Sequence, residues 1–273
     1  MGNSFRLMST RRTVQSISAN VAALTGAVAS ILLPAGCRLC DQLLASASRL
    51  PICDACLSGF APVPPGSCDL CGQPYAFDPE FPKDRACCRD CELHRFGFNL
   101  ARSYGLYDGD LVRAIILLKR EEIEPLGRWF ARQLAAIVRR EGERLAADLI
   151  VPVPLHRQRV RERGFNQVDA FGRPLSRLLH LPYKPVLLVR SKARPEKHLL
   201  RNEERWEAVR GAFAMQKGGR VDNLRILLLD DVMTTGATLD ACSRALLEAG
   251  ARSVVGLTIA RAGQPVSFFV DSR

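Results

Sequence analysis

The chain has 273 residues, of which 47% are hydrophobic and 25% charged, values typical of globular proteins that argue against intrinsic disorder. This length has room for one medium domain and a smaller one. The net charge of +11 is unevenly placed, because residues 150–220 hold 16 Lys and Arg against 6 Asp and Glu, a local excess of +10. Either a solvated basic face or an anionic ligand would explain this bias.

Residues 1–36 carry several arginines and then a mostly apolar run from Val21 to Leu33. A secretion signal is one interpretation, because Pro34-Ala35-Gly36-Cys37 faintly resembles a lipoprotein cleavage site. Proline is wrong for that position, and a run of about 13 residues is too short to span a bilayer. We therefore expect an amphipathic helix that docks on the rest of the protein, no transmembrane segment, and a cytoplasmic location.

Eight of the ten cysteines form four C-x-x-C pairs, separated by 12, 11 and 16 residues. The pairs are Cys37/Cys40, Cys53/Cys56, Cys68/Cys71 and Cys88/Cys91. Four thiolates satisfy one tetrahedral Zn²⁺, and a C-x-x-C pair supplies two of them from one tight knuckle. The pattern predicts about two structural zinc ions, most simply one on the first four cysteines and one on the last four. Disulfides, free thiols and redox pairs are the alternatives.

The segment that carries these pairs is rich in Pro, Gly and Asp and poor in long apolar runs. Apolar burial alone would hardly fold it, so metal binding would supply its stability. Cys87 is a spare thiol that could replace Cys88, whereas Cys242 looks like an ordinary cysteine on a helix face. We expect the domains to be 1–36, 37–98 and 99–273.

Strand and helix patterns alternate after Phe98, which predicts an α/β fold with a parallel sheet and ligands at the carboxyl ends of its strands. The expected strands are Ser103–Tyr107, Leu149–Pro154, Val186–Val189, Ile226–Leu229 and Val254–Ile259. The expected helices span Leu111–Lys119, begin at Pro125, and open within residues 156–167. The helix that begins at Pro125 carries an apolar stripe from Trp129 to Val138.

The apolar strand Ile226–Leu229 ends in two adjacent carboxylates and a turn rich in hydroxyl groups, and a helix follows near Thr238. The N–H groups of such a turn and helix N-terminus suit a phosphate, and the acid pair can accept hydrogen bonds from two neighbouring ribose hydroxyls. Gly236 permits close approach of the backbone because it has no Cβ. An ordinary polar turn is the plain alternative. The whole string resembles the 5-phosphoribosyl-1-pyrophosphate (PRPP) motif of type I phosphoribosyltransferases.

Taken together, these stretches resemble the ComF family, proteins of DNA uptake and related functions that join a double zinc ribbon to a phosphoribosyltransferase fold. The resemblance covers roughly residues 30–262. Its marks are the four cysteine pairs, Lys119 in LLKR, VPVPLHRQRVRERGFNQ at 151–167, the basic stretch that ends in Gly211-Ala212-Phe213, and DDVMTTGAT at 230–238. It implies a type I phosphoribosyltransferase-like parallel sheet flanked by helices.

The resemblance also implies a PRPP site that uses Mg²⁺. Its residues would be Asp230, Asp231, Val232, Met233, Thr234, Thr235, Gly236, Ala237, Thr238, Leu155, His156 and Arg157. Contacts to pyrophosphate or nucleic acid would come from Arg159, Arg161, Arg163, Lys192, Arg194 and Lys197, and residues 190–201 occupy the place of a lid.

No catalytic residue is assigned from the sequence. Thr234 stands where purine-salvage relatives often carry an Asp that can act as a base, and Arg194 and Lys197 stand where ComF proteins commonly show Thr and Gln. His156 and His198 are candidates for acid–base groups or, alternatively, solvated loop residues.

Two functions follow from these features. In the first, the chain binds PRPP and handles single-stranded DNA in competence or DNA uptake, with a protein partner on the zinc ribbons. In the second, it is an active phosphoribosyltransferase of nucleotide metabolism. The basic stretch lies beside the expected phosphate site, so we favour an anionic ligand over a solvated face. Phe165 and Trp206 would stack on bases or belong to the core.

Overall fold

The structure, a computed structural model, describes residues 36–44, 50–75, 86–94, 96–191 and 206–263. The helix expected within residues 1–36 falls almost wholly outside the described residues, as do Lys192, Arg194, Lys197 and His198. The chain divides into two compact units between Gly59 and Phe60. The finer division into 1–36, 37–98 and 99–273 stays a prediction. Within the described ranges, no helix is long and apolar enough to cross a membrane.

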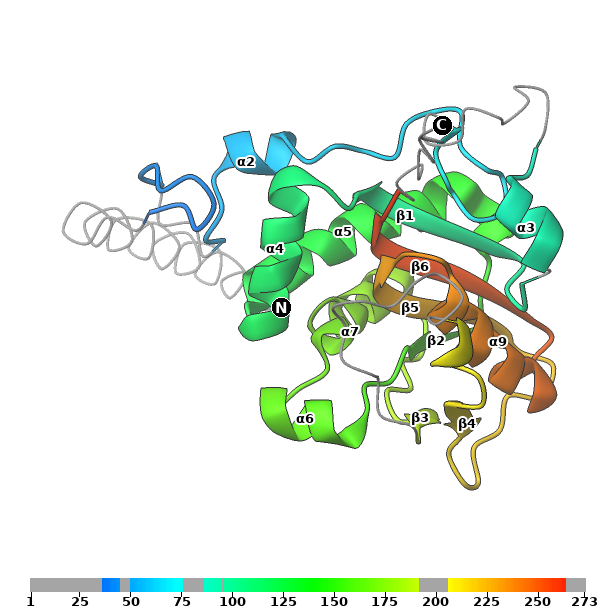
Figure 1. Cartoon of the computed structure of the whole chain (residues 1–273). Coiled ribbons are helices and arrows are strands. Elements are labelled where there is room, and N and C mark those ends of the chain that lie inside the picture. Colours follow the sequence, from blue (N-terminus) through cyan, green and yellow to red (C-terminus); the bar gives the residue numbers. More distant parts are fainter. Residues whose placement is uncertain (1–35, 45–49, 76–85, 95, 192–205, 264–273) are drawn as a thin grey trace, which may run out of the picture. The chain divides into compact units, whose positions relative to one another are not determined.

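A parallel sheet of four strands forms the centre of the second unit (Figure 1). The strands, in spatial order, are β1 (Leu100–Leu106), β6 (Ser253–Arg261), β5 (Arg225–Met233) and β2 (Leu149–Pro152). The apolar run Ile226–Leu229 lies in β5, next to the middle of the sheet, and is wholly buried, as expected for a strand covered on both faces. The predicted parallel α/β sheet with flanking helices is confirmed.

Different helices cover the two faces of the sheet. Side chains alternate along a strand, so neighbouring residues of β5 face different helices. Ile226 and Leu228 share a core with Leu239 of helix α9 (Ala237–Glu248). Helices α5 (Glu124–Glu141) and α7 (Gln167–Leu179) contact each other and the sheet. Helix α4 (Gly109–Arg120) precedes them, and the 3₁₀ turn η2 (Gly142–Leu145) follows α5. Cys242 is fully buried on α9, which confirms its expected place on a helix face.

The helix expected within 156–167 is two helices. Helix α6 (Arg157–Arg163) ends at Gly164, whose φ of +81° takes the chain out of the helix before α7 begins. Asn166 caps α7 by accepting from the Val168 N–H, and its amide donates to the Val153 carbonyl. This pair of hydrogen bonds fixes the start of α7 to the chain just past the end of β2.

Two details of the expected strands are wrong. The strand near Val186 is β3 (Leu188–Arg190), which pairs antiparallel with β4 (Phe213–Met215) in a separate sheet. Val186 itself is 72% exposed, so it contributes nothing to the buried parallel sheet. Strand β5 does not stop at the acid pair: it continues to Met233, because Asp230 and the residues after it still pair with β6.

Candidate functional site

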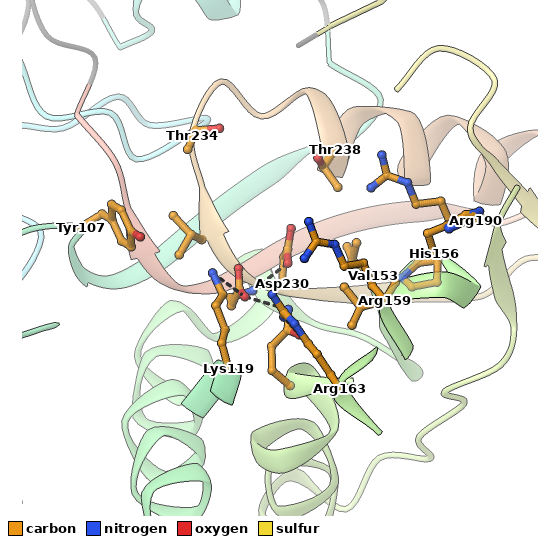
Figure 2. A pocket seen from close by; sticks show the side chains of 15 residues that line it. Tyr107, Lys119, Val153, His156, Arg159, Arg163, Arg190, Asp230, Thr234 and Thr238 are labelled. Atoms are coloured by element: carbon orange, nitrogen blue, oxygen red, sulfur yellow. Dashed lines mark hydrogen bonds and ion pairs between the residues drawn. The ribbon is translucent and has the colours of Figure 1, made fainter. Parts of the chain in front are cut away.

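A pocket of about 200 Å³ opens at the carboxyl ends of β2 and β5 (Figure 2). Parallel strands end at the same edge of a sheet, which is where open α/β sheets bind ligands. The lining comes from the chain just after β1 and β2, from the end of β5 and the turn after it, from β3, and from helices α4, α6, α7 and α9. It consists of Tyr107, Lys119, Val153, Pro154, Leu155, His156, Arg159, Arg163, Gln167, Arg190, Asp230, Asp231, Val232, Thr234 and Thr238.

Two side chains from neighbouring helices hold Asp231 in the pocket. Asp231 is 7% exposed, its Oδ2 lies 2.9 Å from Lys119 Nζ, and the same oxygen accepts from Gln167 Nε2 at 2.8 Å. Gln167 Oε1 in turn accepts from Arg163 Nη1 at 2.9 Å. An arginine of α6, an amide of α7, a carboxylate of β5 and a lysine of α4 therefore form one chain of polar contacts, which fixes the carboxylate before any ligand arrives.

The remaining charges make the pocket suited to an anion. Lys119, Arg159, Arg163 and Arg190 are four cations against the two carboxylates of the acid pair. Arg190, at the end of β3, is 9% exposed, and its guanidinium lies 5.1 Å from the centre of the Phe213 ring. Asp230 is half-buried, and its Oδ1 accepts from the Asp231 N–H at 2.8 Å. Several cations around two oxygen acceptors favour a ligand with both phosphate and hydroxyl groups.

The turn between β5 and α9 supplies backbone donors. Gly236 has a φ of +83° and caps α9, and Thr235 Oγ1 accepts from the Ala237 N–H at 3.3 Å. The N–H groups at the start of α9 are the usual donors to an anion at a helix N-terminus. Thr234 and Thr238 line the pocket from the two ends of this turn.

The described candidate residues divide into those at the pocket and those away from it. Leu155, His156, Arg159, Arg163, Asp230, Asp231, Val232, Thr234 and Thr238 line it. Met233, Thr235, Gly236 and Ala237 are buried between the end of β5 and the start of α9, whereas Arg157 and Arg161 lie exposed on α6, outside the lining. His156 caps α6, since its Nδ1 accepts from the Gln158 N–H at 3.3 Å.

Sequence reasoning missed six residues of the lining: Tyr107, Lys119, Val153, Pro154, Gln167 and Arg190. Four of them stood in motifs that were already noticed: Lys119 in LLKR, and Val153, Pro154 and Gln167 in VPVPLHRQRVRERGFNQ at 151–167. Membership of these motifs was the available signal. Arg190 was noticed only as the first residue of the stretch 190–201 in the place of a lid, and its position at the pocket follows from strand β3.

The eight paired cysteines gather into the two groups that their order predicts. We call Cys37, Cys40, Cys53 and Cys56 the first cysteine group and Cys68, Cys71, Cys88 and Cys91 the second cysteine group; in each, all four sulfur atoms lie within 4.8 Å of one another. Sγ–Sγ distances of 3.5–3.6 Å in the second group and 3.7–3.9 Å in the first are far too long for disulfides. They are close to the roughly 3.8 Å edge of a ZnS₄ tetrahedron.

Backbone donors at the cysteine groups also suit metal-bound thiolates. Burial raises the pKa of the Cys37 thiol, but N–H groups of Cys53, Leu39 and Cys40 outweigh this and lower it to about 6. In the second group, hydrogen bonds from the thiols of Cys71, Cys88 and Cys91 lower the pKa of Cys68. Each group therefore fits one Zn²⁺, which would be bound by its four sulfur atoms and would hold the loops together. Cys87 is half-buried and stands outside both groups.

The two candidate stacking residues differ in their surroundings. The Trp206 ring stacks on Phe96 with centroids 5.6 Å apart, and Phe96 stacks on Phe98 at 4.6 Å. Trp206 thus belongs to an aromatic row at the margin of the core, while Phe165 is half-buried between α6 and α7. A role for either residue in base stacking stays a prediction.

Curated relatives of this chain are proteins of DNA utilisation and competence. The "DNA utilization protein YhgH" of Escherichia coli and that of Salmonella typhimurium are each 30% identical over 225 residues, which cover 82% of this chain and 96% of the relative. The "Competence protein ComFC" of Bacillus subtilis is 27% identical over 226 residues, 77% of this chain and 84% of that protein. Other matches are shorter: one to an Escherichia coli YhgH, 33% identical over 145 residues, spans 53% of this chain and 63% of the relative.

Solved structures similar to this chain include enzymes with PRPP or phosphoribosyltransferase in their names. Glutamine PRPP amidotransferase from Bacillus subtilis is 19% identical with a TM-score of 0.33, covering 50% of this chain and 26% of that one. Adenine phosphoribosyltransferase from Thermoanaerobacter pseudethanolicus is 16% identical with a TM-score of 0.31. The match covers 49% of this chain and 80% of that one. No protein-family model matches the chain. On the identity and coverage of the YhgH relatives, the chain belongs to the ComF family of competence and DNA utilisation proteins.

Proposed function

We propose that this protein binds PRPP with Mg²⁺ in the pocket of Figure 2 and handles single-stranded DNA during DNA uptake or utilisation. The observation that carries the proposal is the pocket itself. Two adjacent carboxylates, four cations and a helix N-terminus converge at the carboxyl edge of a parallel sheet. A sugar bearing phosphates at two positions needs this combination of acceptors and donors.

Each part of PRPP has a matching part of the pocket. The 5-phosphate would lie on the turn from Thr234 to Thr238, with backbone N–H groups and threonine hydroxyls as donors. The ribose hydroxyls would donate to Asp230 and Asp231. A carboxylate offers about four acceptor sites, so Asp231 can accept from a hydroxyl in addition to Lys119 and Gln167.

The pyrophosphate would lie between the chain at Leu155–Arg157 and the cations of α6. Arg159 and Arg163 line the pocket there, and Arg190 lies on its rim beside His156. Mg²⁺ prefers oxygen ligands and commonly binds through substrate phosphates, so it would enter with the pyrophosphate. These positions make α6 the main determinant of the affinity for the pyrophosphate.

DNA binding is proposed for the basic surface that continues from the pocket over α6. All residues of α6 are at least partly exposed, and Arg157 and Arg161 are exposed and lie outside the pocket lining. A neighbouring hollow of about 350 Å³ shares Lys119 and Arg163 with the pocket and adds Arg120 and Glu162. PRPP needs only a few cations, so this surface has charge left for phosphates of a polynucleotide. The names of the relatives, DNA utilization and competence proteins, support the same role.

An active phosphoribosyltransferase is the second candidate. Cations around a leaving pyrophosphate would stabilise its developing charge, which favours transfer chemistry. Thr234 in place of an acidic residue offers no evident base, so the acceptor would need its own nucleophile or a base from another segment. A cytoplasmic location and a protein partner on the cysteine-rich segment remain parts of the proposal.

Competition between the two ligands tests the proposal. PRPP with Mg²⁺ and a single-stranded oligonucleotide would each be titrated alone and then against the other by calorimetry. We expect PRPP to bind at the pocket and the oligonucleotide to bind over α6 and to weaken as salt rises. Well-folded protein that binds no PRPP would refute the ligand assignment. Release of pyrophosphate on incubation with free bases would favour the enzyme instead.

A further inference from the structure

We propose that Arg261 couples the second cysteine group to the turn that would bind the phosphate, so that the metal state of that group controls the turn. Arg261 is the last residue of β6 and is 2% exposed. Its Nε donates to the Cys71 carbonyl at 3.3 Å, and Nη2 lies 3.9 Å from Cys71 Sγ. Its Nη1 donates to the carbonyls of Met233, at 3.2 Å, and of Thr234. One side chain thus links a knuckle of the second cysteine group to the start of the turn.

The charge of Arg261 explains why the cysteine group matters to it. A guanidinium does not lose its proton in a protein, and a buried cation is costly unless an anion or several acceptors surround it. Among the described residues, no carboxylate forms an ion pair with Arg261; its hydrogen-bond acceptors are the carbonyls and Cys71 Sγ. Four thiolates around one Zn²⁺ carry a net negative charge. The metal-bound group would therefore supply the anion that this buried cation needs.

The peptide geometry explains how Arg261 acts on the turn. The C=O of Thr234 and the N–H of Thr235 belong to one planar trans peptide and point in opposite directions. Because Arg261 holds the carbonyl, it turns the Thr235 N–H to the other side of the chain. The Met233 carbonyl is held twice, by Arg261 and by the Ala262 N–H at 2.9 Å, which fixes the preceding peptide as well. Arg261 is thus a positioning residue that never needs to touch the ligand.

Because of this coupling, the two cysteine groups should differ in their effect on the turn. The second group lies in the same compact unit as the sheet, and its four cysteines belong to the core that contains Met233 and Ala237. The first group belongs to the other unit. Loss of zinc from the second group, or oxidation of its thiols, would remove both the anion and the fixed position of the Cys71 carbonyl. The turn would then be less ordered, whereas loss of zinc from the first group would leave it unchanged.

Amide hydrogen exchange of the full-length protein tests the coupling without reference to any activity. Arg261→Met is compared with Arg102→Met, which removes another largely buried guanidinium. Arg102 lies on β1, the neighbour of β6, and pairs with Glu141 of α5. We expect exchange in peptides covering residues 233–238 to rise about tenfold in Arg261→Met and to stay at the wild-type rate in Arg102→Met. In Arg261→Lys, which keeps the charge but loses the forked geometry, exchange of these peptides should rise by less than in Arg261→Met.

Variants that disrupt one cysteine group at a time provide a second test by the same exchange measurement. Cys40→Ser in the first group should leave exchange of 233–238 unchanged, while Cys71→Ser in the second should raise it as Arg261→Met does. Equal exchange in Arg261→Met and wild type, with near-ultraviolet circular dichroism retained, would overturn the proposal. So would an effect of Cys40→Ser as large as that of Cys71→Ser.

A binding measurement connects this inference with the proposed function. Only this measurement rests on the proposed function; the exchange experiments do not. With ribose 5-phosphate as the probe, Arg261→Met should bind about tenfold more weakly than wild type, in parallel with its faster exchange. Failure of wild-type protein to bind the probe would count against the PRPP assignment alone, because the exchange data decide the coupling independently. Equal affinity of wild type and Arg261→Met, despite faster exchange, would overturn the link between turn order and phosphate binding.

Discussion

Lys119 Nζ lies 2.9 Å from Asp231 Oδ2, so the last turn of α4 is tied to the carboxyl end of β5 by a largely buried ion pair. The lysine side chain is 18% exposed and the aspartate 9%, which means that solvent screens the pair only weakly. Gln167 shares the same carboxylate oxygen from a third element, α7. The pocket is therefore assembled by contacts between three elements, and its geometry depends on the pair.

Lys119→Met is expected to destabilise the protein and to weaken PRPP binding. Removal of the ammonium leaves a buried carboxylate with one partner fewer, at a cost of about 1–3 kcal/mol in the free energy of unfolding. It also removes one of the four cations of the pocket. Denaturant unfolding and PRPP titration measure the two effects.

A double-mutant cycle separates the ion pair from other effects of Lys119→Met. Asp231→Asn alone should weaken PRPP binding by about 1.5–3 kcal/mol if the ribose bond is buried. Together the two substitutions should cost less than the sum of the single ones, with a coupling of at least about 0.5 kcal/mol in the free energy of unfolding. Strict additivity would mean that the pair contributes nothing to stability.

Gly236→Ala is expected to abolish or strongly weaken binding of ribose 5-phosphate. Gly236 has a φ of +83°, and an added Cβ would lie 2.9 Å from Met233 Cε and 3.1 Å from Phe96. The Met233 and Phe96 side chains or the turn itself must shift to relieve these contacts, and we expect the turn, which an alanine at a positive φ already strains, to move with its N–H groups. Isothermal titration with ribose 5-phosphate gives the loss, which we expect to exceed about tenfold.

Gly218→Ala is the matched control for backbone strain. Gly218 has nearly the same φ, +81°, but an added Cβ would have no atom within 4 Å. Both substitutions should therefore cost about 1–2 kcal/mol of stability from the left-handed backbone alone. Only Gly236→Ala should lose the ligand. Equal binding by both variants would show that the turn does not hold the phosphate.

The elements that sequence reasoning found are those whose signals are local. The buried run Ile226–Leu229 and Pro125 at the start of α5 each predicted an element from neighbouring residues alone, and the structure confirms both. The spacing of the cysteines predicted two groups of four because a C-x-x-C pair already holds two ligands together.

The parts that escaped sequence reasoning depend on contacts between distant residues. Gln167 and Asp231 are 64 positions apart, and Arg261 and Cys71 are 190 apart. No periodicity or motif joins such pairs, because the fold alone brings them together. The strand β3 was assigned to the wrong sheet for a related reason: three residues carry too little pattern to distinguish a parallel from an antiparallel partner.

Elemental analysis of the purified protein is expected to give about two zinc ions per chain. Cys53→Ser should remove one ion and unfold the first cysteine group, yet leave the thermal transition of the sheet unit nearly unchanged, because that group belongs to the other compact unit. Cys68→Ser should remove the other ion and lower that transition, because Cys68 is 1% exposed within the core of the sheet unit. Calorimetry distinguishes the two. Identical effects of both variants on the sheet transition would contradict the assignment.

Affinity for a single-stranded oligonucleotide is expected to fall steeply with salt, and the variant Arg157→Ala/Arg159→Ala/Arg161→Ala should both weaken binding and flatten that dependence. These three arginines are exposed on α6. Each phosphate contact on a single strand contributes about 0.7 to the slope of log affinity against log salt, so loss of three should reduce the slope by about 2. Fluorescence anisotropy across a salt series measures it. Binding should depend weakly on sequence, since the described helices carry no recognisable base-reading motif.

A matched variant makes the DNA prediction specific to α6. Arg128→Ala/Arg132→Ala/Arg140→Ala removes the same charge from exposed positions on α5, a helix that lines neither the pocket nor the hollow beside it. If α6 is the DNA surface, this control should keep nearly the full slope, although net charge falls equally in both variants. Equal loss in the two would mean that DNA responds only to the overall charge of +11. Binding that neither variant alters would place the DNA elsewhere, and the pocket would then be left with its small-molecule role alone.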